Sequence, residues 1–130
     1  SLARSLPAKR RLVLLGQAGD RDDQAIRELA QSAWTLPPDR IILKEMPKYL
    51  RGRAAGEITA LLGEELRRLG APAEAIEVCG SEFEAVRAAL HWAAPGDLLV
   101  LPVHAERERV LGLLGRLERE GWAPGSPVPA

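Results

Sequence analysis

The chain has few of the features that most directly narrow a protein's function. Its single cysteine, Cys79, in 130 residues excludes an intrachain disulfide framework and any metal site built from several cysteines, and it favours a reducing, cytoplasmic compartment. The 18 basic and 18 acidic residues cancel, which argues against a domain that binds nucleic acid mainly by neutralising phosphates. No apolar run approaches the roughly 18–20 residues that cross a bilayer. No charged-then-apolar leader opens the chain, so we expect no contact with a membrane.

Three common site motifs are also missing. A phosphate-binding loop of the G-x-x-x-x-G-K-[ST] type needs a lysine after glycine, and none of the three lysines (Lys9, Lys44 and Lys48) follows one. The dinucleotide fingerprint G-x-G-x-x-G is absent, which argues against a nicotinamide or flavin site. No G-x-S-x-G turn supports a hydrolase nucleophile. The chain therefore cannot hold ATP in the phosphate-loop manner by itself.

What the chain does contain is a regular alternation of apolar runs and helical patterns. Continuous runs at 12–15, 41–43 and 98–101 are typical of strands buried on both faces, whereas the alternating run at 76–79 suits a strand nearer an edge. Helical patterns of 10–15 residues separate the runs. This alternation predicts one α/β domain, a three-layer Rossmann-like unit whose mainly parallel sheet has the strand order 3-2-1-4 and helices on both faces.

Local signals set the expected limits of the elements. Ser81 and Glu84 form a capping box at the start of the third helix, and Gly70 with Pro72 stops the second. We expect the domain to cover residues 1–122 and the Pro- and Gly-rich segment 123–130 to be a flexible tail. Residues 1–7 resemble the end of a helix, which suggests a piece of a longer chain.

The segment Gly16–Asp23 follows the first predicted strand and leads into a helix. Gly16 and Gly19 permit a close backbone approach to a ligand, and a helix start favours an anion. The same spacing also occurs in an ordinary strand–helix turn with an aspartate cap. The acidic cluster Asp20-Arg21-Asp22-Asp23 is open to two interpretations, the positioning of a cation or charged substrate, and helix capping with compensation of the helix dipole.

A second candidate segment follows the second predicted strand. It holds Lys44, Lys48, Arg51 and Arg53 against one acid, with Gly52 between the two arginines. Guanidinium groups bind carboxylate or phosphate through paired hydrogen bonds, but a solvated basic loop has the same composition.

Three further side chains complete the set. His104 follows the fourth strand at the same edge of the sheet, where ligands of such folds bind, and it is a further candidate. His91 and Cys79 are interpreted as structural residues.

The combined pattern resembles the C-terminal domain of the Mur ligase superfamily, and most closely its cyanophycin synthetase branch. The resemblance rests on a strand followed by Gly16-x-x-Gly19-Asp20-Arg21-x-Asp23, then Leu50-Arg51-Gly52-Arg53 and Gly56-Glu57, and the segment Pro95-Gly96-Asp97 before the last strand. It covers about residues 9–121. The D-Y-A-H-N-P-like motif of the family is missing, and Met46–Tyr49 replace the acidic residues expected before Arg51.

The resemblance implies an ATP-dependent ligase that activates a carboxylate as an acyl phosphate, with Mg²⁺, and joins it to the amine of an amino acid. N-terminal and central domains of a parent chain would be its partners, and the central domain would carry the phosphate loop. By similarity, the segment Gly16–Asp23 faces the nucleotide cleft, while Lys44, Arg51, Gly52, Arg53 and His104 form the substrate-binding set. We expect no catalytic residue, metal or bound cofactor in this chain alone.

Two alternatives follow from the residues themselves. One is a stand-alone α/β module that binds a nucleotide or a small anion without catalysis. The other is an interaction domain whose loops contact a protein partner. Departures from the family pattern leave the identity of the amino-acid substrate open.

Overall fold

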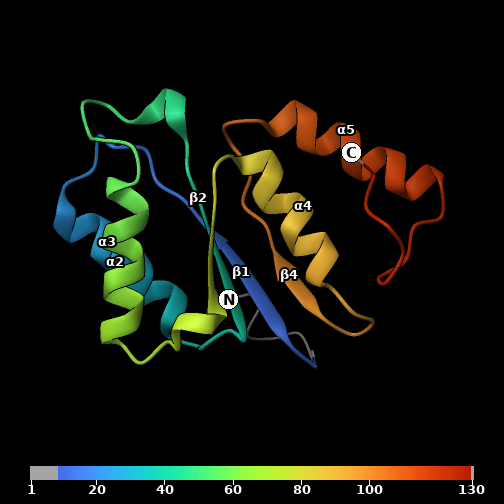
Figure 1. The fold of residues 1–130 in the computed structure, drawn as a ribbon, viewed down its shortest axis with the longest axis horizontal. Coiled ribbons are helices and arrows are strands. Elements are labelled where there is room, and N and C mark those ends of the chain that lie inside the picture. The colour runs from blue at the N-terminus through green and yellow to red at the C-terminus, as the bar shows by residue number, and fades with distance from the viewer. Residues whose placement is uncertain (1–8, 130) are drawn as a thin grey trace.

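A computed structural model describes residues 9–129, which form three layers with a parallel sheet in the middle. Two helices lie on each side of the sheet (Figure 1). Residues 1–7, for which the end of a helix was predicted, lie outside the described part. In order, the elements are β1 (Arg11–Leu15), α2 (Asp23–Trp34), β2 (Arg40–Lys44), η1 (Pro47–Tyr49), α3 (Glu57–Arg68), η2 (Ala73–Ala75), β3 (Ile76–Cys79), α4 (Glu82–Trp92), β4 (Leu98–Val100) and α5 (Arg107–Arg119).

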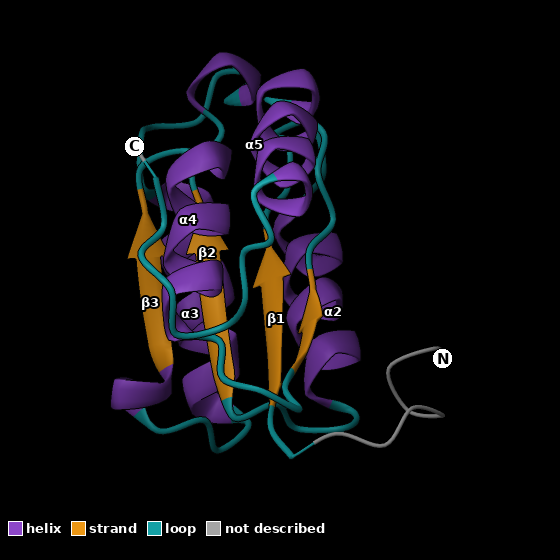
Figure 2. Ribbon diagram, turned by 90° about the vertical axis from the view of Figure 1, so that its right-hand side faces the viewer, coloured by secondary structure: helices purple, strands orange, loops and turns teal. Residues whose placement is uncertain are grey.

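The sheet has the strand order β3-β2-β1-β4, and every pairing is parallel. Figure 2 shows the strands pointing the same way, with β1 in the interior of the sheet. The predicted fold class and strand order are therefore confirmed. The order reverses between β1 and β4, so that the chain winds outward in both directions from this pair. Ligands of open parallel sheets bind at the carboxyl ends of the strands beside such a reversal.

Alternating side chains of the central strands build two hydrophobic cores. Leu12, Leu14 and Ile42 face α4 and α5, while Leu15, Ile41 and Leu43 face α2 and α3. Period-two alternation with both faces apolar is what a continuous hydrophobic run produces in a covered sheet. β3 lies at one edge, as its alternating sequence predicted, and Val78 is 57% exposed there. All three tryptophans are partly buried and pack against these cores.

The helix starts follow the signals in the sequence. The Ser81 hydroxyl accepts a hydrogen bond from the Glu84 amide, which confirms the predicted cap of α4. Asp22 caps α2 by accepting from the Ala25 amide. The strand limits differ slightly from the expectation, because β2 extends to Lys44 and β4 ends at Val100. Lys44 is thus the last residue of a strand and not the first of a loop.

The segment after α5 makes specific contacts. The Trp122 indole donates to the Ser126 and Pro127 carbonyl oxygens, each at 3.2 Å, and the Arg87 guanidinium donates to the Pro129 carbonyl oxygen at 3.1 Å. Val128 packs against the core beneath α4 and α5. The flexibility of this tail stays a prediction. A mobile tail would have to break the contacts described here. No helix within residues 9–129 is both long and apolar enough to cross a membrane.

Candidate functional site

The candidate site lies at the carboxyl edge of the sheet, where the segments after β1, β2 and β4 meet. A hollow of about 250 Å³ opens there, lined by Gly16–Ala18, by Met46 and Tyr49, and by His104 and Ala105. We call it the β1–β4 hollow. A smaller neighbouring hollow of about 190 Å³ shares Met46, Tyr49 and Ala105 with it. The three candidate segments of the sequence thus come together at the reversal point of the sheet, as their positions after the strands predicted.

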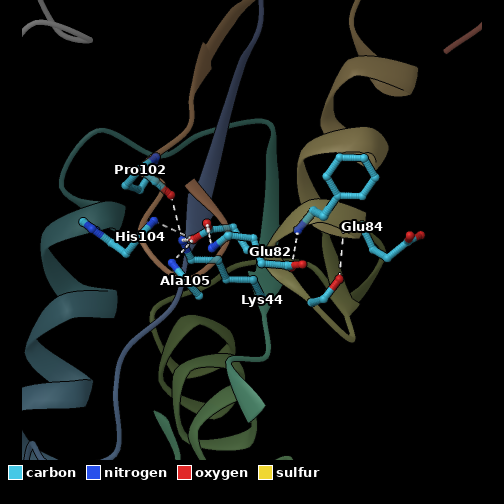
Figure 3. Close-up of polar contacts among 9 residues, drawn as sticks. Lys44, Glu82, Glu84, Pro102, His104 and Ala105 are labelled. Atoms are coloured by element: carbon cyan, nitrogen blue, oxygen red, sulfur yellow. Dashed lines mark hydrogen bonds and ion pairs between the residues drawn. The ribbon is translucent and has the colours of Figure 1, made fainter. Parts of the chain in front are cut away.

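Lys44 and Glu82 form a buried ion pair beneath the β1–β4 hollow. The Lys44 ammonium lies 2.5 Å from one carboxylate oxygen of Glu82 and 2.7 Å from the Pro102 carbonyl oxygen. Both side chains are at most 1% exposed. Figure 3 shows the two side chains meeting the segment after β4. Lys44, predicted to bind substrate, is therefore engaged inside the protein, where an unpaired charge would be very costly.

Glu82 also organises the segment that leads into α5. Its carboxylate accepts hydrogen bonds from the backbone amides of His104 at 2.8 Å, Ala105 at 3.2 Å and Glu106 at 2.7 Å. Burial by itself would raise the pKa of Glu82, but the hydrogen bonds from Lys44 and from the His104 and Glu106 amides outweigh it and lower the pKa below its usual value. Glu82 is the residue that reasoning from the sequence missed, because the only local signal around it is the cap formed by Ser81 and Glu84.

A matching hydrogen bond runs from the start of α4 to a carboxylate at the start of α5. Glu106, the cap residue of α5, accepts a hydrogen bond from the Phe83 amide in the first turn of α4 at 2.9 Å. Glu82 and Glu106 therefore each lie against the start of the other's helix, where a carboxylate offsets the positive end of the helix dipole. The starts of α4 and α5 are joined as one unit.

Arg53 connects the segments after β1 and β2. Its guanidinium donates to the carbonyl oxygens of Gly19 at 3.1 Å and Arg21 at 2.6 Å, and pairs with Asp23 at 2.8 Å and with Glu57 at 2.5 Å. The hydrogen bonds to Asp23 and Glu57 raise its pKa above the usual arginine value. Arg53 and Asp23, both predicted to face ligand, thus hold the two segments together.

Arg51 lies at the tip of a tight turn beside this connection. The Arg53 amide donates to the Leu50 carbonyl oxygen at 3.1 Å, and both central residues, Arg51 (φ 52°) and Gly52 (φ 88°), have positive φ, as in a type I′ turn. Positive φ is uncommon for a residue with a side chain. The guanidinium lies 5.4 Å from the centre of the Tyr49 ring and is otherwise exposed to solvent.

The positive charge that remains at this edge comes from exposed side chains. Within residues 9–129, Arg21, Lys48 and Arg51 form no ion pair. Asp20, beside Arg21, and His104, on the segment after β4, are exposed as well. Guanidinium and ammonium groups without a partner attract carboxylate or phosphate. These cations are therefore available to attract an anionic group at this edge of the sheet.

Two of the three aspartates in the acidic cluster after β1 make contacts that support the fold. Asp22 caps α2 and Asp23 pairs with Arg53. Among the described residues, no group of three or more histidine, cysteine, aspartate or glutamate side chains is arranged to hold a metal ion. Of the two interpretations left open by the sequence, capping is the one for which the structure provides contacts.

A hollow of about 590 Å³, larger than the β1–β4 hollow, lies elsewhere, between β3, α4 and the C-terminal segment. Cys79 and His91, both interpreted as structural, line it. None of the candidate residues of the sequence reaches it. Its size alone does not make it the site, since the motif-bearing segments and the reversal of strand order coincide at the β1–β4 hollow.

Comparisons with known proteins add no assignment, since no family model and no curated protein matches this chain.

Proposed function

We propose that this chain is the C-terminal, substrate-binding lobe of an ATP-dependent Mur-type ligase, which joins a carboxylate to the amine of an amino acid. ATP would be held by a phosphate loop on another domain, and this lobe would close over it in the cytoplasm. The lobe alone would be inactive. The proposal starts from the resemblance carried by Gly16–Asp23, by Leu50–Arg53 and by Pro95–Asp97.

One observation supports it above the alternative of a stand-alone nucleotide-binding module. A carboxylate of the chain itself lies against the start of each helix that follows a described strand. These are Asp22 for α2, Glu45 on the Gly56 amide for α3, Glu106 for α4 and Glu82 for the segment entering α5. Proteins of related architecture bind phosphate at such helix starts. A resident carboxylate repels a second anion, so this chain is poorly suited to hold a triphosphate unaided.

The exposed cations suit the proposed role. Arg21, Lys48 and Arg51 are exposed on the segments that follow β1 and β2, at the edge where a second domain would close. In a lobe that closes over a nucleotide, cations that are unpaired in the open state can form ion pairs with the substrate or nucleotide on closure. There they would orient an anionic group of the substrate or offset charge that develops as the amine attacks the acyl phosphate.

Closure would also protect the intermediate. An acyl phosphate hydrolyses in water, so a lid that excludes solvent favours attack by the amine. Magnesium would be bound elsewhere in the ligase, because residues 9–129 present no cluster of carboxylates arranged for it. The contribution of this chain is binding and orientation.

The test uses the protein encoded by the complete gene. Amino acids and dipeptides, which carry both a carboxylate and an amine, are offered as a panel with ATP and Mg²⁺, and ADP release is measured together with the mass of any amide product. We expect ADP release that depends on the panel, and its loss when residues 9–129 are deleted.

A second measurement separates the two functions. Calorimetry of the isolated chain with ATP and Mg²⁺ should show weak or undetectable binding if it is a lobe. Tight binding by the isolated chain, or a complete gene that encodes no phosphate loop, would establish the stand-alone module instead.

A further inference from the structure

We infer that the buried Lys44–Glu82 pair is a positioning element of the candidate site, which sets the separation of the two walls of the β1–β4 hollow without touching a ligand. This inference deepens the proposed function and rests on it for its kinetic readout. It is carried by contacts that reach from the pair to both walls. The pair itself is enclosed, with both side chains at most 1% exposed.

The first wall is in contact with the stem of Lys44. A Cβ atom built on Gly16 would lie 2.5 Å from Cγ and 2.7 Å from Cε of Lys44. Real Cβ atoms essentially never come this close, so the lysine stem passes directly over the glycine backbone. A glycine is thus required at position 16 to make room for the Lys44 side chain. The sequence had also suggested that Gly16 makes room for a ligand.

The second wall is held by the charged ends of the pair. The Lys44 ammonium donates to the Pro102 carbonyl oxygen, and Glu82 accepts from the amides of His104 and Ala105. Those two residues line the β1–β4 hollow together with Gly16–Ala18. One lysine side chain therefore contacts Gly16 of the first wall and the Pro102 carbonyl oxygen beside the second. Figure 3 shows the Glu82 carboxylate at the amides of His104 and Ala105.

The energetics favour a role in geometry. An apolar pair of the same size at a buried site is often as stable as an ion pair, because both charges must lose their hydration. What the charged pair adds here is a set of directional hydrogen bonds. Each of its hydrogen bonds is made to a defined backbone atom of the segment 102–106, so the segment is fixed in one arrangement.

A matched control exists at the amino ends of β1 and β4, the strands whose carboxyl ends lead into the two walls. Arg10 precedes β1 and pairs with Asp97, which precedes β4, at 2.6 Å. Asp97 is 2% exposed and, like Glu82, also accepts from a backbone amide, that of Ala94. Glu82→Gln and Asp97→Asn therefore make the same chemical change in two buried carboxylates that each pair with a cation, and only Glu82 holds a wall of the hollow.

The experiment compares these two variants in the complete ligase and in the isolated chain. We expect both to lower the thermal midpoint, and only Glu82→Gln to lower kcat/KM, by about tenfold or more, because misplacing a binding wall weakens productive binding. In nitrogen–proton correlation spectra of the chain, Glu82→Gln should shift the amides of both 16–18 and 104–105, whereas Asp97→Asn should leave them in place.

Equal losses of kcat/KM in the two variants, or shifts confined to the residues that bond Glu82 directly, would overturn the inference. If the ligase itself shows no ATP-dependent amide formation, the proposed function fails, and the amide shifts still decide the positioning role. If Glu82→Gln does not fold, Glu82→Asp keeps the charge and shortens the side chain by one methylene. It should shift the same two groups of amides, and spectra unchanged at 16–18 would again contradict the inference.

Discussion

Gly19 and Leu50 are in backbone contact so close that a Cβ atom at position 19 would lie 1.8 Å from the Leu50 carbonyl oxygen. The Gly19 amide also donates to the neighbouring Tyr49 carbonyl oxygen at 2.8 Å. The segments after β1 and β2 therefore approach at a point where only glycine fits. The contact supports the turn that carries Arg51.

Gly19→Ala should lower the free energy of unfolding by about 2–3 kcal/mol, because the methyl group meets rigid backbone and the two segments must separate. Urea denaturation followed by circular dichroism measures the change. Gly112→Ala in α5 is the control, since a Cβ there meets nothing within 4 Å and alanine favours a helix by about 1 kcal/mol over glycine. A Gly19→Ala variant as stable as the parent would show that the contact is not tight.

Substitutions at Arg51 and Arg53 should have different effects, with the loss of stability confined to Arg53. Arg53→Ala removes hydrogen bonds to the Gly19 and Arg21 carbonyl oxygens and two ion pairs, so we expect a loss of about 2 kcal/mol in unfolding free energy. Arg51→Gly removes a guanidinium held at positive φ, so stability should stay constant or rise by up to about 1 kcal/mol.

The same pair is then compared for activity. In the complete ligase, Arg51→Gly should reduce kcat/KM although its fold is intact, and Arg51→Lys should restore only part of it, because an ammonium lacks the planar fork of donors. Full activity of Arg51→Gly would remove Arg51 from the substrate-binding set.

The fold was predictable because its signals are local and periodic. Apolar runs broken by capped helices define a parallel sheet, and the order 3-2-1-4 follows from simple connection rules. The capping box at Ser81 and the stop at Gly70 could be read from neighbouring residues alone. The same local rules explain why the ends of β2 and β4 were placed within one residue.

The roles within the site were less predictable, because they depend on partners distant in sequence. Lys44 and Glu82 are 38 residues apart in the sequence, and Arg53 donates a hydrogen bond to Gly19, which is 34 residues away. A basic residue near a strand end has the same local pattern whether it faces a ligand or a buried carboxylate. Only the fold separates Arg51, which is exposed, from Lys44 and Arg53, which are engaged.

Cys79 should be unreactive in the folded protein at neutral pH. Its side chain is buried at the end of β3, and burial together with the nearby Glu77 carboxylate raises the pKa of its thiol to about 11. The thiolate is the reactive form, so little of it exists at pH 7–8. Labelling by a chromogenic disulfide reagent should be slow in buffer and fast in urea. Rapid labelling without denaturant would show that the edge at β3 opens.

Acid should destabilise the fold through Glu65 in a defined pH range. Hydrogen bonds from Arg68 and Gln31 lower the pKa of this carboxyl group from 4.5 to about 2 in the folded protein. A lowered folded-state pKa means that the unfolded chain binds the proton more readily. The stabilisation is therefore complete above pH 4.5 and is lost as the pH falls toward 2.

Urea unfolding between pH 2.5 and 7 measures this dependence. Glu65→Gln should be less stable than the parent at pH 7, and the difference should shrink steadily below pH 4.5, because the parent carboxyl group then becomes neutral as well. Glu64→Gln is the control for the exchange itself, since that exposed glutamate in the middle of α3 forms no ion pair within residues 9–129 and its replacement should leave the stability at pH 7 nearly unchanged. A difference between Glu65→Gln and the parent that is constant from pH 7 to 2.5 would show that the contribution of Glu65 lies in shape and not in charge.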